Sequence, residues 1–491
     1  MDSAFMGWDV GTQALKAVVL NEAGEVLWEK SHPYPIGSPA ETWFEQEPST
    51  WLAAYDAIAE QFVAASLPVH LRGVGFTGQM HTTVVTDANG CPLRPAILWS
   101  DQRASHYGPI LIDRWGTAGT AAVGGNYPLA NFSALRLLWI RDHEPRIFDN
   151  LRRVALAKDW LRNQVSGSWA TDVTDASGTY LFDVARRQWA SEWAQHLGLE
   201  TSSWFGPAVE SATIVGSVMR GPECLCGLPV VAGAGDQEAS AVGTGVVSPG
   251  TLGISLGTSG VVFMPTGEFQ PPRHPAVHAF CHAVPGGWHW MAVTQAAALC
   301  WRWYRDAFFP GLTYSELDQR VAQVSSDGIF FFPYLQGERA PLMNAQIPGI
   351  LMGIRPHHTA VEIGKAVLEG VAFSLYHAWV AMQEDAWPGL APRVVMTGGG
   401  SASPVWAQII ADVFGQPVSV VGDAGAAAGA AWLAFQGVDK HDNPLPVKPL
   451  TSYEPGPASP RYREDADTFI RWAERLNQAW QDEEHRAIRS R

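Results

Sequence analysis

The sequence predicts an α/β protein made of two related halves. Its length of 491 residues exceeds the roughly 100 to 200 residues of a typical domain, so two or more domains are expected. Short apolar segments with tight turns alternate with longer segments whose apolar residues recur every three or four positions, as in strands and helices. In addition, residues 8–20 (WDVGTQALKAVVL) resemble residues 254–264 (ISLGTSGVVFM): each is an apolar strand, a Gly-Thr turn and a second apolar strand.

The similarity between these two segments sets the expected domain boundary. Thr12 and Thr258 lie about half the chain apart, which indicates an internal repeat. We therefore predict an N-terminal half of residues 1–247 and a C-terminal half of residues 248–491. Because Gly-Thr turns between strands are common, the repeat gains weight only from the motifs described below.

The N-terminal half is expected to begin with strands. Residues 5–30 predict antiparallel strands around a first turn at residues 11–13. Residues 50–66 predict a helix, because their apolar side chains are spaced by three and four positions. Residues 73–93 predict a second strand-turn-strand unit, with its turn at residues 87–90.

The C-terminal half contains a strand that leads through glycines into a helix. The strand is predicted at residues 393–396 and the glycine turn at residues 398–400. Ser401 or Ser403 can cap the helix that follows. Residues 465–486 predict a charged terminal helix with one apolar stripe, to which we assign no chemistry.

Composition excludes several classes of protein. The net charge of −15 and the pI of about 5.4 disfavour binding to nucleic acid or to an anionic membrane surface. The five cysteines are odd in number and show no repeated Cys-x-x-Cys pair, which argues against a disulfide framework or a zinc ribbon. The N-terminus lacks the pattern of a signal peptide, and no apolar run reaches the roughly 18 to 20 residues of a membrane span. We expect a soluble protein of the reducing cytoplasm.

Three glycine-rich turns are candidates for binding phosphate groups. They are Gly11-Thr12-Gln13, Gly257-Thr258-Ser259-Gly260 and Gly398-Gly399-Gly400. Glycine lets backbone N–H groups approach a phosphate closely and allows unusual backbone angles. The Walker pattern is absent from the sequence, so a nucleotide would be held between two domains. The alternative for each turn taken alone is an ordinary connection between elements.

Two aspartates follow apolar strands and are candidate catalytic groups. Asp9 directly precedes the first Gly-Thr turn, where a carboxylate can hold a magnesium ion through water; alternatively, it caps the turn. Asp236 lies among small residues in GAGDQEAS. As a general base, it would take the proton of a sugar hydroxyl while a phosphoryl group arrives. The alternative is that Asp236 is the N-cap of a helix.

Histidines offer a second set of candidates. His81 follows a glycine-containing strand end and is accompanied by Gln79, so that two polar side chains are available for sugar hydroxyls; alternatively, His81 is a packed strand residue. His278, Cys281 and His282, in HAFCH, resemble metal ligands. Because strand alternation sends adjacent residues to opposite faces, a structural role is favoured for these residues.

These motifs, in this order, resemble those of the FGGY family of carbohydrate kinases, and the resemblance covers almost the whole chain. WDVGT resembles the first phosphate motif, GAGDQEASAVGTG the segment of the catalytic aspartate, SLGTSG the second phosphate motif and TGGGSASPVWAQIIADVFGQPV the adenosine motif. FFFPYLQGERAPLMNAQIPGILMGI resembles a signature of the family's second domain. Within the family, GQMH, LRPAILWSDQRA, LAKDWLR and TDVTDASGTYLFDV resemble the xylulokinase branch.

The resemblance implies a fold and a reaction. It implies two actin-like, ribonuclease H-like domains with MgATP and a sugar in the cleft between them, the N-terminal domain binding the sugar and the C-terminal domain the nucleotide. The reaction would be ATP-dependent phosphorylation of D-xylulose at its C5 hydroxyl, with Asp236 as the base. Asp9 would support Mg²⁺, and a homodimer is expected. The resemblance assigns the sugar to Gln79, Met80, His81 and Asp236, and the nucleotide to Thr12, Gln13, Gly257, Thr258, Gly399 and Gly400.

Four positions depart from the pattern of the family. Gln13 and Ala14 replace a small hydroxyl residue and a glycine, and Gln237 and Ser100 stand where the xylulokinase branch often has asparagine. These departures leave open a family member that acts on ribulose, a ketotetrose or gluconate. A non-catalytic actin-like ATPase is a further alternative, although the combination of Asp236 with GQMH argues against it.

Overall fold

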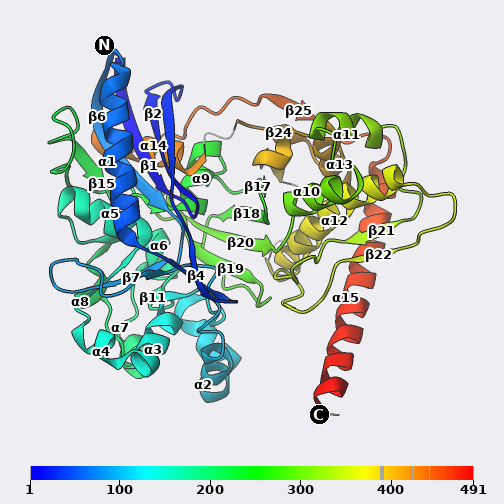
Figure 1. The fold of residues 1–491 in the computed structure, drawn as a ribbon, viewed down its shortest axis with the longest axis horizontal. Helices are drawn as coiled ribbons and strands as arrows, with labels where there is room; N and C mark the ends of the chain where they lie inside the picture. Colours follow the sequence, from blue (N-terminus) through cyan, green and yellow to red (C-terminus); the bar gives the residue numbers. More distant parts are fainter. Residues whose placement is uncertain (1, 387–391, 423–424, 442, 490–491) are drawn as a thin grey trace.

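The computed structural model describes residues 2–386, 392–422, 425–441 and 443–489. In this part of the chain, two seven-stranded sheets form the centres of two lobes, one for each half of the sequence (Figure 1). Helices cover the sheets, and α15 extends from the C-terminal lobe towards the C-terminus.

The N-terminal sheet combines a meander with parallel strands. Its path is β14-β15-β6-β1-β2-β3, and β16 also pairs with β6. β2 is antiparallel to both β1 and β3, whereas β6 is parallel to β1, β15 and β16. The strands are β1 (Asp2–Val10), β2 (Ala14–Asn21), β3 (Val26–Pro33), β6 (Val69–Gly78), β14 (Ile214–Ser217), β15 (Pro229–Val231) and β16 (Ala234–Gly235).

The C-terminal sheet repeats this arrangement. Its path is β19-β20-β18-β17-β23-β24-β25. β17 and β18 form an antiparallel hairpin, and β23 and β24 continue parallel to β17. The strands are β17 (Thr251–Leu256), β18 (Gly260–Thr266), β19 (Val277–Cys281), β20 (Trp288–Thr294), β23 (Arg393–Thr397), β24 (Val418–Val420) and β25 (Thr451–Tyr453). The predicted α/β class is confirmed, and the two similar hairpins begin corresponding sheets.

Smaller sheets and helices complete the lobes. A five-stranded sheet consists of β4 (Gly37–Ala40), β5 (Trp43–Gln46), β8 (Ala96–Ile97), β7 (Thr83–Thr86) and β9 (Arg153–Leu156). Two-stranded sheets pair β10 (Thr171–Asp172) with β13 (Ala208–Val209), β11 (Phe182–Asp183) with β12 (Gln188–Trp189), and β21 (Phe330–Phe332) with β22 (Ile350–Met352). The helices before residue 250 are α1 (Pro48–Ala65), α2 (Tyr107–Gly124), α3 (Ser133–His143), α4 (Pro145–Asn150), α5 (Ala157–Ser166), α6 (Val173–Ser177), α7 (Ser191–Leu197), α8 (Ser202–Phe205) and α9 (Asp236–Thr244). Those after it are α10 (Ala298–Phe308), α11 (Tyr314–Val321), α12 (Ala360–Ala386), the 3₁₀ turn η1 (Gly399–Ala402), α13 (Pro404–Phe414), α14 (Gly425–Asp439) and α15 (Ser459–Arg489).

Helix α14 belongs to the C-terminal half of the sequence but packs on the N-terminal sheet (Figure 1). Its backbone approaches the strands closely. A Cβ on Gly7 of β1 would lie 1.9 Å from the carbonyl oxygen of Ala427, and one on Gly75 of β6 would lie 2.0 Å from that of Ala430. Glycine at these two strand positions therefore permits the contact. The two lobes are thus tied together by α14, which crosses from the C-terminal half of the sequence to the N-terminal sheet.

Several predicted elements differ from the structure. The strands at residues 5–30 are confirmed as β1, β2 and β3, but residues 73–93 are not one hairpin, because β6 and β7 belong to different sheets. The turn at residues 87–90 exists and leads only to an isolated bridge between Thr86 and Pro92. Pro92 lacks the backbone N–H that a longer strand ladder would need, which is consistent with a single bridge after the turn.

The helical predictions hold with shifted ends. Ser403, and not Ser401, caps α13, because its hydroxyl accepts a hydrogen bond from the N–H of Trp406 at 3.1 Å. The terminal helix α15 begins at Ser459, six positions before the predicted start at residue 465. Pro460 at its first turn is favourable there, whereas the apolar spacing used for the prediction begins later.

Candidate active site

Three parallel strands of the N-terminal sheet end side by side and bring the predicted sugar and phosphate residues together. In the register, Val10 of β1 pairs with Gly78 of β6, and Gly78 pairs with Gly235 of β16. The residues that follow these strand ends are the first Gly-Thr turn, the Gln79–Met80–His81 segment and Asp236. Ligands of open α/β sheets bind at this carboxyl edge, so the edge is a candidate binding site.

Asp236 is the first residue of α9 and lies against the Gln79–Met80–His81 segment. Its carboxylate accepts hydrogen bonds from the backbone N–H groups of Met80 and Gln237. Gly235, and not Asp236, occupies the N-cap, so the capping alternative for Asp236 is wrong. Burial, with a contribution from the charge of Glu238, raises the pKa of Asp236 to about 7. A carboxyl group with this pKa is suited to accept a proton near neutral pH.

His81 is buried and held in one protonation state. Its Nδ1 lies 3.0 Å from the carbonyl oxygen of Gly178; because a carbonyl only accepts, Nδ1 carries the proton and Nε2 is left as an acceptor. Burial and the charge of Arg136 lower the pKa of His81 to about 3, so the ring is neutral. The residue has a positive φ of 67°, a strained conformation that is typical of functional sites.

The first Gly-Thr turn is fixed by side chains from elsewhere in the N-terminal half. Trp99 donates from Nε1 to the hydroxyl of Thr12 at 3.0 Å, and Gln46 donates to the carbonyl oxygen of Thr12 at 2.7 Å. Gln46 also accepts a hydrogen bond from the side-chain amide of Gln79 at 3.0 Å. Gln13 is exposed beside the turn. One hydrogen-bond network therefore joins the phosphate candidate to the sugar candidate.

Gln79 and Asp9 keep oxygen atoms near this edge. Gln79 is 2% exposed, and within the described ranges its Oε1 has no hydrogen-bond partner, so it can accept a hydrogen bond from a ligand. Asp9 is half-buried at the penultimate position of β1, and its charge contributes to raising the pKa of Tyr34. The hydroxyl of Tyr34 donates to the carbonyl oxygen of Gly11 at 2.5 Å, which places the Asp9 charge beside the turn.

The C-terminal sheet presents a matching edge. β17 and β23 are parallel, with Ser255 paired to Thr397, so the turns that follow them, Gly257-Thr258 and Gly398–Gly400, are neighbours. Gly398 has a φ of 84°, and a Cβ on it would lie 2.8 Å from the backbone of Leu256. A Cβ on Gly399 would meet nothing within 4 Å. The backbone at Gly399 is thus open to a ligand.

The two halves meet around these edges. Glu238 of α9 lies 3.2 Å from Nε2 of His289 on β20, and both side chains are fully buried. Arg339 of the C-terminal half lies over the ring of Trp99, 5.2 Å from its centroid, and its charge contributes to the lowered pKa of His81. A cation therefore approaches the sugar candidates from the opposite half.

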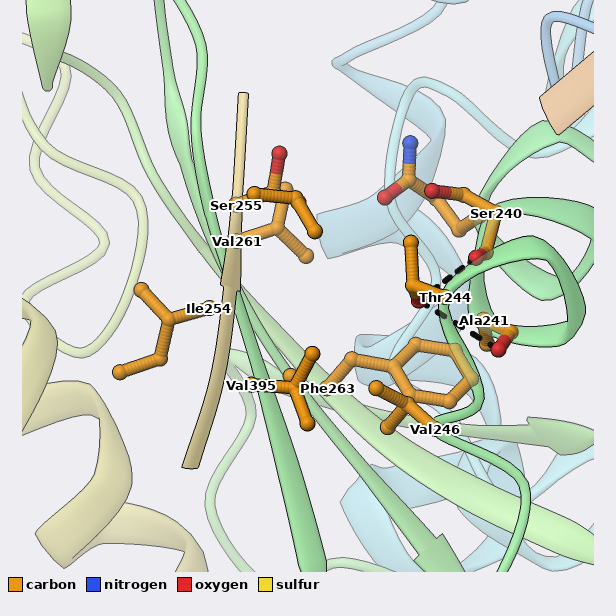
Figure 2. Close-up of a pocket in the computed structure, with 12 residues that line it drawn as sticks. Ser240, Ala241, Thr244, Val246, Ile254, Ser255, Val261, Phe263 and Val395 are labelled. Carbon is orange, nitrogen blue, oxygen red and sulfur yellow. Dashed lines mark hydrogen bonds between the residues drawn. The ribbon is translucent and has the colours of Figure 1, made fainter. Parts of the chain in front are cut away.

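A narrow pocket lies between α9 and the C-terminal sheet (Figure 2). Ser240 and Thr244 of α9 stand on one side and Val261 and Val395 on the other, and the ring of Phe263 reaches from the Val395 side towards Thr244. The pocket offers about 30 Å³, which is room for about two water molecules. Its lining extends from Gln237, next to Asp236, to Ser255 and Thr397, which lie two and one positions before the second and third turns. The pocket therefore lies between the segment of Asp236 and the strands that lead to the second and third turns.

The histidines of HAFCH have structural environments. Both ring nitrogens of His282 are engaged, Nε2 with the carbonyl oxygen of Val246 at 3.2 Å and Nδ1 with the N–H of Val284 at 3.0 Å. Burial lowers the pKa of His278 to about 4 and that of His282 to about 3. Among the described residues, neither histidine belongs to a group that could hold a metal ion. The structural role favoured from the sequence is consistent with these contacts.

Sequence reasoning missed several residues of this region. Gln46, Trp99, Glu238, His289 and Arg339 were not selected. Trp99, Glu238 and Arg339 lie inside segments that resemble family motifs, so a signal existed for each segment but not for each side chain. Gln46 and His289 carry no local pattern, because their importance comes only from distant contacts.

Comparisons with known proteins agree with this geometry. Residues 4–243 match the N-terminal domain, and residues 252–437 the C-terminal domain, of the FGGY family of carbohydrate kinases. These matches span well over half of the chain. The protein belongs to the FGGY family of carbohydrate kinases and is an enzyme that uses ATP.

Individual relatives extend the comparison. The chain is 36% identical to the xylulose kinase of Klebsiella pneumoniae, over 91% of this chain and 92% of the relative. It is 37% identical to the xylulose kinase of Escherichia coli strain K12, over 88% of this chain and 89% of the relative. A solved structure of a xyloylose kinase from Brucella ovis superimposes with a TM-score of 0.89 at 33% identity, covering 97% of this chain and all of that one. The expected fold of two actin-like domains is confirmed.

No helix in the stretches of chain that the structure describes is both long and apolar enough to cross a membrane.

Proposed function

We propose that the enzyme transfers the terminal phosphoryl group of MgATP to the C5 hydroxyl of D-xylulose, with Asp236 as the general base. The observation that carries this proposal is the position of Asp236. Its carboxyl group, with a pKa of about 7, stands at the strand edge that also carries Met80 and His81. Phosphoryl transfer to a sugar needs a base at this place, because a sugar hydroxyl is a weak nucleophile until its proton is shared.

The neighbouring residues have complementary tasks. Nε2 of His81 accepts a hydrogen bond from a sugar hydroxyl, because its Nδ1–H is committed to Gly178. Oε1 of Gln79 accepts a second, and the Met80 side chain, which is 5% exposed, packs against the carbon chain. Holding the hydroxyl in line with the phosphate converts an encounter into a unimolecular step.

The nucleotide lies between the first turn and the two C-terminal turns in this proposal. Thr12 and Gln13 line it from one half, and Gly257, Thr258, Gly399 and Gly400 from the other. Support comes from the open backbone at Gly399 and from the fixed Thr12 turn. The division into residues 1–247 and 248–491 assigns the sugar mainly to the first half and the nucleotide to the second.

A magnesium ion fits the donors at the first turn. Mg²⁺ prefers oxygen ligands and keeps several waters, and Asp9 is a half-buried carboxylate next to that turn. We assign Asp9 to the ion through water. When bound, the ion neutralises charge on the phosphates that the chain's own groups leave unmatched.

The choice of D-xylulose follows from the xylulose kinases described above and from the segments of the xylulokinase branch. Ribulose, a ketotetrose and gluconate remain alternative substrates because of Gln237 and Ser100. The expectation that the protein forms a homodimer rests on family resemblance alone. All five cysteines are free thiols, and this fits the cytoplasm as the expected compartment.

Sugar-dependent ADP release tests the proposal. The purified protein is assayed with MgATP and D-xylulose, D-ribulose, L-ribulose, L-xylulose, erythrulose, glycerol and gluconate, with Asp236→Asn in parallel. We expect D-xylulose to give the highest kcat/KM, and the variant to lose at least about 100-fold in kcat, the usual contribution of a general base. Faster turnover of another sugar would overturn the substrate, and full activity of the variant would overturn the base.

A further inference from the structure

A cluster of charged side chains lies buried behind the strand edge of the N-terminal half. We call it the Lys158 cluster; it consists of Lys158, Asp159, Arg162, Asp172 and Asp175. Nζ of Lys158, fully buried, contacts Asp159 at 2.7 Å, Asp172 at 2.9 Å and Asp175 at 3.1 Å. Arg162 contacts Asp159 at 3.0 Å. The sequence segments LAKDWLR and TDVTDASG supply all five residues, and the reaction outlined above uses none of them.

The cluster is costly to bury. Two cations face three carboxyl groups, and burial raises the pKa of Asp175 well above its usual value, because desolvation disfavours its charged form. A buried ion cluster is weak evidence for stability, since apolar side chains of similar volume often serve as well. The fixed directions of its hydrogen bonds are what apolar side chains cannot replace.

One of these hydrogen bonds leads directly to the proposed base. The hydroxyl of Thr174 donates to Oδ2 of Asp172 at 2.7 Å and accepts a hydrogen bond from the backbone N–H of Gly235 at 2.8 Å. Gly235 is the N-cap of α9 and immediately precedes Asp236. Arg162 donates to the carbonyl oxygen of Ala232, three residues upstream of Gly235. The cluster therefore holds both ends of the 232–235 turn.

This turn, Ala232-Gly233-Ala234-Gly235, has no polar side chains with which to hold itself. Gly233 has a φ of 81°, and a Cβ there would lie 1.8 Å from the carbonyl oxygen of Phe76. A Cβ on Gly235 would lie 2.7 Å from Cγ of Met80. Glycine is required by these approaches, and it leaves the backbone free to shift unless other groups restrain it. Polar groups from outside the turn supply the restraint.

We propose that Thr174 is a positioning residue, which transmits the fixed geometry of the Lys158 cluster to Gly235 and so sets the place of Asp236 relative to the reacting hydroxyl. This inference rests on the proposed role of Asp236. Misplacement of a catalytic group by about 1 Å can cost about 100-fold in rate. The effect belongs to kcat, because Thr174 itself contacts neither sugar nor nucleotide in the proposal.

The test compares Thr174→Val, Thr174→Ser and Ser211→Ala. Valine keeps the shape of threonine and removes the hydroxyl, whereas serine retains it. Ser211 is a matched control, because its hydroxyl is also buried and donates to the same Oδ2 of Asp172, at 2.9 Å. Its contact with the 232–235 turn, within the described ranges, is made by its backbone carbonyl oxygen, which accepts from the N–H of Gly233 at 2.9 Å, and Ser211→Ala keeps this bond. Each variant is assayed for kcat and KM with the best sugar of the panel and for its thermal unfolding midpoint.

We expect Thr174→Val to lose about 10- to 100-fold in kcat with both KM values within about threefold, Thr174→Ser to recover most of it, and Ser211→Ala to stay near the parent. If Thr174→Val fails to fold, Thr174→Ala against Thr174→Ser gives the same comparison. Equal kcat losses in Thr174→Val and Ser211→Ala, or no loss, would overturn the positioning role. A parent protein inactive with every sugar would instead count against the proposed function.

Discussion

At the scale of single residues, burial rather than residue type determines the chemistry of the site. Asp236 and His81 are ordinary titratable groups in the sequence. In the structure, burial raises the pKa of the carboxyl group to about 7 and lowers that of the imidazole to about 3. Both shifts favour the neutral form, as desolvation requires. The carboxyl group thereby becomes a base of moderate strength, and the imidazole becomes a fixed acceptor.

The raised pKa of Asp236 predicts the pH dependence of turnover. Only the deprotonated carboxylate can accept a proton, so kcat/KM should fall about tenfold per pH unit below about pH 7 and level off above it. His81 stays neutral throughout this range, because its pKa of about 3 lies well below it. The measurement is kcat/KM for the sugar between pH 5 and 9, with parallel checks that the protein stays folded. A fall in kcat/KM that begins only near pH 4, the usual range of a free carboxyl group, would contradict the prediction.

The candidate site was only partly accessible to sequence reasoning at this scale. Asp236, Met80 and His81 were identifiable because each follows a strand with a recognisable motif, and the parallel register then brings them together. The strained φ of His81 and the contact of Glu238 with His289 could not be found. They depend on residues far away in the chain, and no local periodicity encodes them.

At the scale of elements, the glycine turns divide into those that serve packing and those that leave space. Gly398 combines a positive φ with close contact to Leu256, whereas Gly399 faces open space. In this motif, glycine at position 398 is therefore required by the backbone conformation and packing, whereas glycine at position 399 leaves space beside the backbone. The sequence predicted a phosphate turn for the whole segment and could not separate the two, since the difference arises from the approach of β17 to β23.

This contrast predicts different effects for two neighbouring substitutions. Gly399→Ala should leave unfolding unchanged and raise KM for ATP, by about tenfold if the methyl group costs about 1.4 kcal/mol of binding. Gly398→Ala should destabilise the protein by about 1 to 3 kcal/mol through its backbone conformation. Urea unfolding and ATP titration of both variants provide the check. An unchanged KM in Gly399→Ala would place the nucleotide elsewhere.

At the scale of the whole molecule, the two halves are similar in sheet order but not independent. The repeat in sequence correctly indicated two corresponding sheets. It did not indicate that α14 crosses to the N-terminal sheet, because the sequence of an alanine-rich helix does not specify which sheet the helix packs against. The partner is specified on the other side, by Gly7 and Gly75. The position of residue 247 as a boundary between independently folding units therefore stays a prediction.

The packing of α14 on the N-terminal sheet predicts the behaviour of fragments of the N-terminal half. Residues 1–247 alone lack α14 and leave the glycine face of β1 and β6 uncovered, so we expect no cooperative unfolding transition. Fusing residues 421–441 to this fragment through a flexible linker should restore one. The matched control is the same fusion with Gly429→Leu, because even a Cβ on Gly429 would lie 1.8 Å from the carbonyl oxygen of Ala239. Circular dichroism during heating measures the outcome, and a cooperative transition in the bare fragment would refute the expectation.

The same helix has a consequence for biosynthesis. The N-terminal lobe leaves the ribosome first, yet its last helix ends at Asp439, about 190 residues after residue 247. At roughly 5 to 20 residues per second, the lobe waits about 10 to 40 s for the element that completes it. During this interval its glycine face is uncovered, so we expect the timing of translation, and not only the stability of the final fold, to affect the yield of native enzyme.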